Sequence, residues 1–509
     1  MTRHQICLMA VTATSLLPFK CLSTIGSTAC RLLHANTRTT YSRFSFLNQL
    51  KRLARIQFAA HHNSAEKLTF EKQPASWLFV NNTFGGLYGS HVNLELDLEN
   101  RLSADNIKQL ELILRRRGLP ADLSSLVDDF TKLRALERQR NGLVSERNEI
   151  AEKLKQMKAE HQDHEPGYQA AAHELLTKLT SIKERIKDLQ MIWDLEEQVM
   201  VRSLKLPNDI HPTTTDEEST VLREVNNLKG SAKTMSHIEI GKKYNLIKFS
   251  NVGPKAYYLK GALAKTELAL MTSLVRYFQK HKFYFISGPE FFRTNIMEGC
   301  GLEVHNPTEV LTILDNVVTQ IEPMIHLAGI STATFVAYVA KCCIGDNYLP
   351  LNMFSCGRRY QNSHLPGLYG ANQTTQVGIF SCLLQEDLDK QFGTNIELIW
   401  NFLAPLGFPI RLTQVKAADL QLAERRRVEI QIYAPSLQKY IPIGNVSDLS
   451  DFVSRRLMVR HNQNHPDYRF APMLHMISGT GVNVTALLAV WMEHSNTDLD
   501  KFCFLPLPV

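Results

Sequence analysis

Two stretches of the chain carry apolar residues at the spacing of packed helices. In the first, an apolar residue recurs every seven positions, at Leu136, Leu143, Ile150 and Met157. In the second, apolar residues alternate by four and three, at Leu175, Leu179, Ile182, Ile186, Leu189, Trp193 and Met200. This spacing predicts an antiparallel two-helix coiled-coil arm over residues 123–204. We expect its turn near 161–167, where Pro166 and Gly167 interrupt the helical pattern.

Different patterns flank the arm. Within an N-terminal region over 63–122, residues 103–117 predict a short helix that ends at a Gly-Leu-Pro sequence. A polar segment over 205–237 is typical of an interdomain linker. Residues 238–509 mix alternating and helical apolar patterns, including a predicted helix over 260–280. These patterns indicate an α+β domain with a substantial sheet.

The first 65 residues contain neither Asp nor Glu but carry Arg and Lys throughout. Within them Leu50, Leu53 and Ile56 lie at helical spacing, so the segment can form a basic amphipathic helix. These features predict a mitochondrial transit peptide over 1–62 and a location in the matrix. A secretory signal with residues 6–19 as its apolar part is the alternative, but the basic composition continues far beyond it. No later segment approaches the roughly 18 apolar residues of a membrane span.

The amino-acid composition excludes few classes of function. The 509 residues are 44% hydrophobic and 21% charged, as in ordinary globular proteins of several domains. A net charge of +7 suits a polyanionic partner such as RNA. The nine cysteines form no Cys-x-x-Cys pair and have no histidines at ligand spacing, so we expect no zinc site, no disulfide framework and no cofactor.

The arm also carries many charged residues outside its apolar positions. A solvated charged face and an RNA-binding face both fit this pattern, and the charges alone do not separate them. The RNA-binding candidates are Arg134, Arg138, Lys153, Lys155, Lys158, Lys178, Lys183, Arg185 and Lys187.

Two segments at the arm resemble the seryl-tRNA synthetases, a class II family. Residues 138–150 resemble the arm of that family, and 206–212, Leu-Pro-Asn-Asp-Ile-His-Pro, resemble the Ile-Pro-Asn-x-x-His-Pro segment that ends it. The resemblance implies an arm that grips the long variable arm of the serine tRNA.

The family's catalytic motifs follow in the same order. Residues 258–261 and Pro289 resemble parts of motif 1. The match to motif 2 lies around Arg359, and the match to motif 3 begins at Gly479. With the arm, the resemblance spans roughly residues 103–493. It implies a catalytic domain built on an antiparallel sheet and dimerisation through motif 1.

The nucleotide site of the family is only partly matched. The motif 3 helix carries an arginine in the family, but the matching residue here is Ala486, although Gly479 and Gly481 of the preceding turn remain. In motif 2 the arginine remains as Arg359, whereas the following glutamate is Gln361. A methyl group cannot neutralise a triphosphate, and phosphoryl-type chemistry depends on such fixed positive charge.

The second half of motif 2 and the amino-acid pocket depart further. Gln373 matches the family, but a nearby arginine becomes Gly370 and the adenine-stacking phenylalanine becomes Thr374. At three positions where the family has a glutamate, this chain has a residue without a carboxylate. An ammonium group is poorly held without buried carboxylates. With those three, the positions that have lost a functional side chain are Thr332, Gly370, Thr374, Gly378, Pro442 and Ala486.

The pattern predicts a catalytically degenerate mitochondrial paralogue with no catalytic residues. Its retained positions, Arg359, Gln361, Gln373, Gly479 and Gly481, are then kept mainly for packing. We expect it to dimerise with the active mitochondrial seryl-tRNA synthetase or with itself, to bind tRNA or other mitochondrial RNA, and to support tRNA charging and mitochondrial translation. The alternatives are an active ligase with a remodelled pocket and an RNA-binding protein that acts without a synthetase partner.

Overall fold

The computed structural model describes residues 75–79, 94–160, 166–189, 191–226, 235–250, 253, 255–307, 309–313, 324–462 and 471–495. The predicted transit peptide over 1–62 lies outside these residues, as does most of the predicted turn of the arm. Within the described residues, no helix combines the length and the apolar character needed to cross a membrane.

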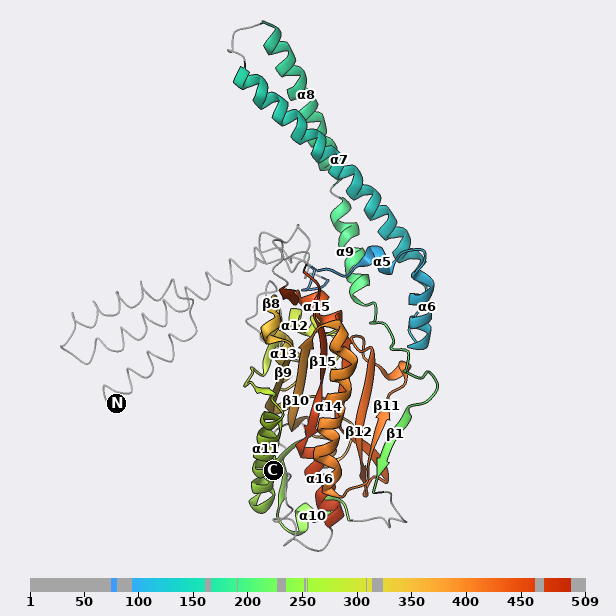
Figure 1. Cartoon of the computed structure of the whole chain (residues 1–509), viewed down its shortest axis with the longest axis vertical. Helices are drawn as coiled ribbons and strands as arrows, with labels where there is room; N and C mark the ends of the chain where they lie inside the picture. The colour runs from blue at the N-terminus through green and yellow to red at the C-terminus, as the bar shows by residue number, and fades with distance from the viewer. Residues whose placement is uncertain are drawn as a thin grey trace, which may run out of the picture. The chain divides into compact units, whose positions relative to one another are not determined.

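The arm consists of one long helix and a returning helix in two parts: α7 (Ser124–Glu160), α8 (Pro166–Asp188) and α9 (Met191–Leu204). Leu143 and Ile150 of α7 and Ile182 of α8 are buried together, which produces the seam expected from the apolar spacing (Figure 1). Pro166 was predicted to interrupt helix, but it is the first residue of α8. Proline is tolerated there because the first helical N–H groups have no partner inside the helix.

Two short helices precede the arm, α5 (Leu98–Arg101) and α6 (Ile107–Arg116). The predicted helix over 103–117 therefore starts four residues late. Ser103 holds a separate turn in which its hydroxyl accepts a hydrogen bond from the Asn106 N–H at 3.3 Å. Leu110 and Leu114 of α6 are buried with Leu133 of α7 and Val199 of α9, so these helices share one core at the root of the arm.

The C-terminal domain is built on an eight-stranded sheet in the order β1-β11-β12-β13-β15-β10-β9-β4, antiparallel except for the β4 and β9 pair. Its strands are β1 (Thr220–Val225), β4 (Tyr284–Phe285), β9 (Leu351–Tyr360), β10 (Gln373–Leu383), β11 (Ile410–Gln414), β12 (Arg426–Ala434), β13 (Lys439–Ser450) and β15 (His475–Asn483). Smaller strand pairs are β2 (Ile247–Ser250) with β3 (Ala256–Leu259) and β8 (Cys343–Gly345) with β14 (Arg460–Asn462); β5 (Phe291–Arg293), β7 (Ile325–Leu327) and β6 (Leu311–Ile313) form a three-stranded sheet. This mixed architecture confirms the predicted fold class.

The two faces of the large sheet differ in chemistry. Strand β12 shows this directly, because buried and half-buried residues alternate strictly along it. On one face Val428 and Ile430 join a core with helices that include α14, which lies over the sheet in Figure 1. The other face carries Arg427 and Glu429, and we call it the polar face. The domain's helices are α10 (His237–Lys243), α11 (Gly261–Lys280), α12 (Thr294–Gly299), α13 (Thr332–Val339), α14 (Leu388–Leu403), α15 (Phe452–Leu457) and α16 (Val484–Ser495).

Between residues 205 and 226, the segment predicted as a linker is instead attached to this domain. Residues 220–225 form β1, which pairs with β11 at the edge of the sheet. Upstream, the side-chain amide of Asn208 donates to the Ala423 and Leu449 carbonyls, both at 2.9 Å. A polar sequence suggests a solvated connection. An edge strand can be equally polar, because one of its sides is not covered by a neighbouring strand. Composition therefore misidentified it.

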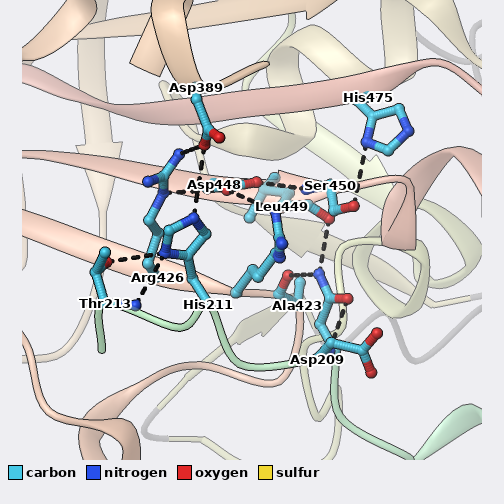
Figure 2. A network of polar contacts seen from close by, with 12 residues as sticks. Asp209, His211, Thr213, Asp389, Ala423, Arg426, Asp448, Leu449, Ser450 and His475 are labelled. Atoms are coloured by element: carbon cyan, nitrogen blue, oxygen red, sulfur yellow. Dashed lines mark hydrogen bonds and ion pairs between the residues drawn. The ribbon is translucent and has the colours of Figure 1, made fainter. Parts of the chain in front are cut away.

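A network of charged groups continues this attachment (Figure 2). His211 lies 3.6 Å from the carboxylate of Asp389, which also pairs with Arg426. The Arg426 Nε lies 3.2 Å from the buried Asp448 carboxylate. Burial lowers the pKa of His211, and the neighbouring Arg426 and Arg425 lower it further. The chain that follows the arm is thus held to the sheet by hydrogen bonds, and His211 lies beside the ion pairs of Arg426.

Candidate functional site

Side chains from several strands meet on the polar face and hydrogen-bond to one another. On β10 the Gln376 amide donates to Thr374 Oγ1 at 3.0 Å. Thr480 of β15 donates its hydroxyl to Gln376 Oε1 at 3.3 Å and its N–H to Asn445 Oδ1 at 3.1 Å. Thr374 was predicted as a position that has lost its function, and here it ends a chain of neutral polar groups.

The same chain of contacts continues into charged residues. Ser447 of β13 donates to Glu424 Oε1 at 2.6 Å, and Arg427 donates to Glu424 Oε2 at 2.9 Å. The Arg427 Nε lies 3.2 Å from Glu429 Oε1, which completes a pairing of one guanidinium with two carboxylates. One guanidinium between two carboxylates leaves a formal excess of one negative charge, and Arg427 is fully engaged by the two glutamates, so it is not a free cation for a phosphate group. The sequence reasoning missed this group, although the alternation of polar residues along β12 was a signal for it.

Arg359, the retained motif 2 arginine, lies on β9 opposite Thr374. Its Nε donates to Gln361 Oε1 at 2.9 Å and another nitrogen donates to the Ile330 carbonyl at 3.1 Å. Within the described residues no carboxylate lies at ion-pair distance from it. Burial lowers the pKa of Arg359 below its ordinary value. The structure thus brings two predicted site residues together, with Gln361 holding the guanidinium where the family has a glutamate.

The region around Gly378 is filled by an apolar side chain. Gly378 lies on β10 opposite Thr480. A Cβ atom added to it would lie 2.7 Å from Ile330 Cγ2 and 3.2 Å from Phe335 Cε2, and both side chains are buried. A carboxylate at this position, as in the resemblance, would need Ile330 to move. Ile330 therefore occupies the room that a side chain at 378 would use.

Gly370 lies in a tight turn at the end of the loop between β9 and β10. A Cβ atom there would overlap the backbone carbonyl of Leu365. A backbone atom cannot rotate away as a side chain can, so an arginine at this position requires a different loop path. Gln373, at the start of β10, is exposed.

The remaining predicted positions are scattered. Thr332 begins α13, where its hydroxyl lies 2.9 Å from the Ser478 hydroxyl. Pro442 is exposed on β13 opposite Gln431, beside an irregularity in the strand register. Neither supplies a charge to the polar face.

The motif 3 positions belong to the structural core. Ala486 lies on α16, is 2% exposed, and is buried among apolar residues of the core. A Cβ atom at Gly479 would overlap the Asn445 carbonyl, and one at Gly481 would lie 3.1 Å from the Phe278 ring. The two glycines are therefore explained by the close approach of β15 to its neighbours.

A buried histidine and glutamate, also missed from sequence, hold the loop between β9 and β10. His237 Nδ1 lies 2.7 Å from Glu493 Oε1, and its Nε2 accepts the Leu368 N–H at 3.0 Å. Because Nε2 accepts, Nδ1 carries the proton that is donated to Glu493. Burial would raise the pKa of Glu493, but hydrogen bonds from His237 and Ser436 outweigh it and lower the pKa.

The arm candidates separate into two groups. Arg134 lies 2.7 Å from Glu137, Lys178 lies 2.7 Å from Glu174, and Lys155 lies 3.8 Å from Glu152. The side chain of Lys158 lies outside the described residues. The candidates that are exposed and have no acidic partner among the described residues are Arg138, Lys153, Lys183, Arg185 and Lys187.

Histidine, cysteine and carboxylate side chains do not gather into a metal-binding group anywhere in the described ranges. Burial raises the pKa of the Cys300, Cys356 and Cys382 thiols to about 12, which favours their neutral form.

Comparison with known proteins agrees with this architecture. A family profile described as tRNA synthetase class II core domain (G, H, P, S and T) matches residues 321–495. The chain is 28% identical over 397 residues to the serine–tRNA synthetase-like protein Slimp of Drosophila melanogaster, covering 76% of this chain and 82% of that protein. It is 26% identical over 439 residues to the mitochondrial serine–tRNA ligase of Mus musculus, covering 81% of each.

Two solved structures share the fold. The seryl-tRNA synthetase from Pyrococcus horikoshii, complexed with ATP, aligns with a TM-score of 0.64 and 16% identity over 79% of this chain and 94% of that one. The cytoplasmic serine–tRNA ligase from Naegleria fowleri, in complex with AMP, aligns with a TM-score of 0.64 and 18% identity over 81% and 98%. At these identities the likeness establishes the architecture alone.

Proposed function

We propose that this chain, which carries a class II aminoacyl-tRNA synthetase core domain and is a relative of the seryl-tRNA synthetases, works without catalysis as a binding or regulatory subunit in mitochondria. The observation that carries the proposal is the packing at two positions where the resemblance implies charged side chains. Ile330 fills the space beside Gly378, and the Leu365 carbonyl fills the space beside Gly370.

The chemistry of amino-acid activation supports this proposal. Transfer of a nucleotide to a carboxylate needs fixed cations around the phosphates and, for serine, carboxylates around the ammonium group. Of the charged groups that the resemblance implies, Arg359 is retained, while Gly378 and Ala486 stand where it implies charged side chains. Losing one such group costs about 10² to 10³ in rate, and here several are absent together.

The proposed partner is the active mitochondrial seryl-tRNA synthetase, or a second copy of this chain. Large exposed apolar residues recur across the motif 1 region, and exposed apolar groups of this size are typical of protein interfaces. They are Tyr258, Leu268, Tyr284, Phe285 and Phe291, which are 39% to 67% exposed. A heterodimer would combine one working site with one silent site and so support tRNA charging and mitochondrial translation.

The matrix location rests on the acid-free basic N-terminus and on the relatedness to mitochondrial serine–tRNA ligases. Binding of tRNA or other mitochondrial RNA rests on the arm, whose exposed unpaired cations suit phosphate groups.

Purified protein incubated with ATP, labelled pyrophosphate and serine tests the absence of catalysis. We expect no exchange above the level of a protein-free control, with an active seryl-tRNA synthetase as the positive control. Exchange that follows this chain through purification, with serine or any other amino acid, would refute the proposal and favour a ligase with a remodelled pocket.

The partner is tested by isolating the native protein from mitochondria and identifying what accompanies it. The active synthetase should be present in near-equal amount if the heterodimer dominates. A chain that is recovered with RNA and without a synthetase would instead favour the alternative of an RNA-binding protein, for which the unpaired arm cations are the supporting observation.

A further inference from the structure

A short segment far upstream of the sheet domain is bound into it. Residues 75–79 come before α5, α6 and the arm in the chain. Three donors from this segment nevertheless converge on one carboxylate oxygen of Glu298 in α12. The Ser76 hydroxyl donates at 2.8 Å, and the Trp77 and Leu78 N–H groups both donate at 3.0 Å. Burial raises the pKa of Glu298, while these hydrogen bonds act in the opposite direction.

The apolar part of the same contact is Leu78. Its side chain is 1% exposed and belongs to the buried cluster of Phe292, Met297 and Leu457. Ser76 is also buried, and its hydroxyl additionally accepts the Leu78 N–H at 3.1 Å, which shapes the segment into a turn. A turn that presents two N–H groups to a carboxylate and a leucine to a core is a built contact rather than an incidental one.

We propose that Ser76–Leu78 is an N-terminal anchor for the sheet domain, and that proteolytic processing which yields the mature protein cuts on the N-terminal side of Ala75. A processing protease would hydrolyse one peptide bond upstream and leave the anchor on the mature chain. A cut beyond Phe79 would remove Leu78 from its cluster and three hydrogen bonds from Glu298. The cut depends on the proposed mitochondrial import, whereas the anchor does not.

Limited proteolysis of the full chain tests the anchor. With a protease of broad specificity, sequencing of the resistant fragment should find its first residue at or before Ala75. In Leu78→Ala the resistant fragment should begin after Phe79, and the melting temperature should fall by several degrees. Leu112→Ala removes the same atoms from a leucine that is 55% exposed, and it should change neither.

Glu298→Ala should weaken the anchor more than Glu298→Gln, because the glutamine keeps one oxygen that can accept the N–H groups. A resistant fragment of the unmodified protein that begins after Phe79, or an unchanged fragment in Leu78→Ala, would overturn the anchor. The N-terminus of the protein from mitochondria tests the cut: a mature chain that begins after Phe79 overturns it. Absence from mitochondria defeats the proposed location and leaves the anchor standing.

Discussion

The polar face of the sheet and the exposed surface of the arm use charge in opposite ways. On the polar face Arg427 is shared between Glu424 and Glu429, while Gln361 and the Ile330 carbonyl hold Arg359. On the arm Lys183 and Lys187 are exposed without acidic partners in the described part of the chain. Paired charges inside a fold contribute to its structure, whereas unpaired exposed cations remain available to a polyanion. This difference is what the proposed function predicts: binding through the arm and no reaction at the sheet.

The largest effect is expected for Gly370→Arg, which introduces the arginine that the resemblance implies. Its Cβ would overlap the Leu365 carbonyl, so we expect a loss of about 3 kcal/mol or more in the free energy of unfolding and no gain of ATP binding. Denaturant unfolding measures the loss. Gly142→Ala is the control, because a Cβ at Gly142 meets nothing within 4 Å. A stable Gly370→Arg protein that binds ATP would show that the loop between β9 and β10 accommodates the arginine.

A double-mutant cycle tests the packing of Ile330 against Gly378. Gly378→Ala alone should cost about 1 to 3 kcal/mol of unfolding free energy, because the new methyl group meets Ile330 at 2.7 Å. In an Ile330→Ala background the same change should cost less, giving a coupling of about 0.5 kcal/mol or more. Additive effects of the two substitutions would mean that Ile330 does not fill the space beside Gly378.

The clamp that holds the loop between β9 and β10 predicts a pH dependence. The pKa of Glu493 is lowered in the folded protein, so its stabilising contribution is present above its ordinary value of 4.5 and is lost as the pH falls through the folded pKa. Glu493→Gln should therefore cost about 1 to 2 kcal/mol at neutral pH and progressively less in acid. Unfolding measured across this range gives the difference, and a difference independent of pH would contradict it.

The smallest effect on stability is expected on the arm. Replacing Lys183, Arg185 and Lys187 together by glutamine should leave the free energy of unfolding unchanged. If these cations contact phosphates, the slope of log affinity for tRNA against log salt should decrease by about 2 to 3. Lys178→Gln is the matched control, because Lys178 already pairs with Glu174. RNA binding with an unaltered slope would assign these three cations to a solvated face.

Local pattern was sufficient wherever a residue's role depends on its near neighbours in the chain. The seam of Leu143, Ile150 and Ile182 followed from heptad spacing, and the predicted helix over 260–280 matches α11. The polar composition of the predicted linker did not reveal β1, because the pairing of β1 with β11 joins segments nearly 200 residues apart.

From the amino-acid sequence alone came the helical arm, the α+β class and the replacement of expected charges by Ala486, Gly378 and Gly370, since these follow from residue identity and order. Whether those replacements leave an empty site or a filled one depended on atoms brought together by folding. Three contacts of this kind join separate segments. Ile330 packs beside Gly378, the Leu365 carbonyl lies beside Gly370, and the Glu298 carboxylate accepts the Leu78 N–H. Only close packing in three dimensions decides such contacts.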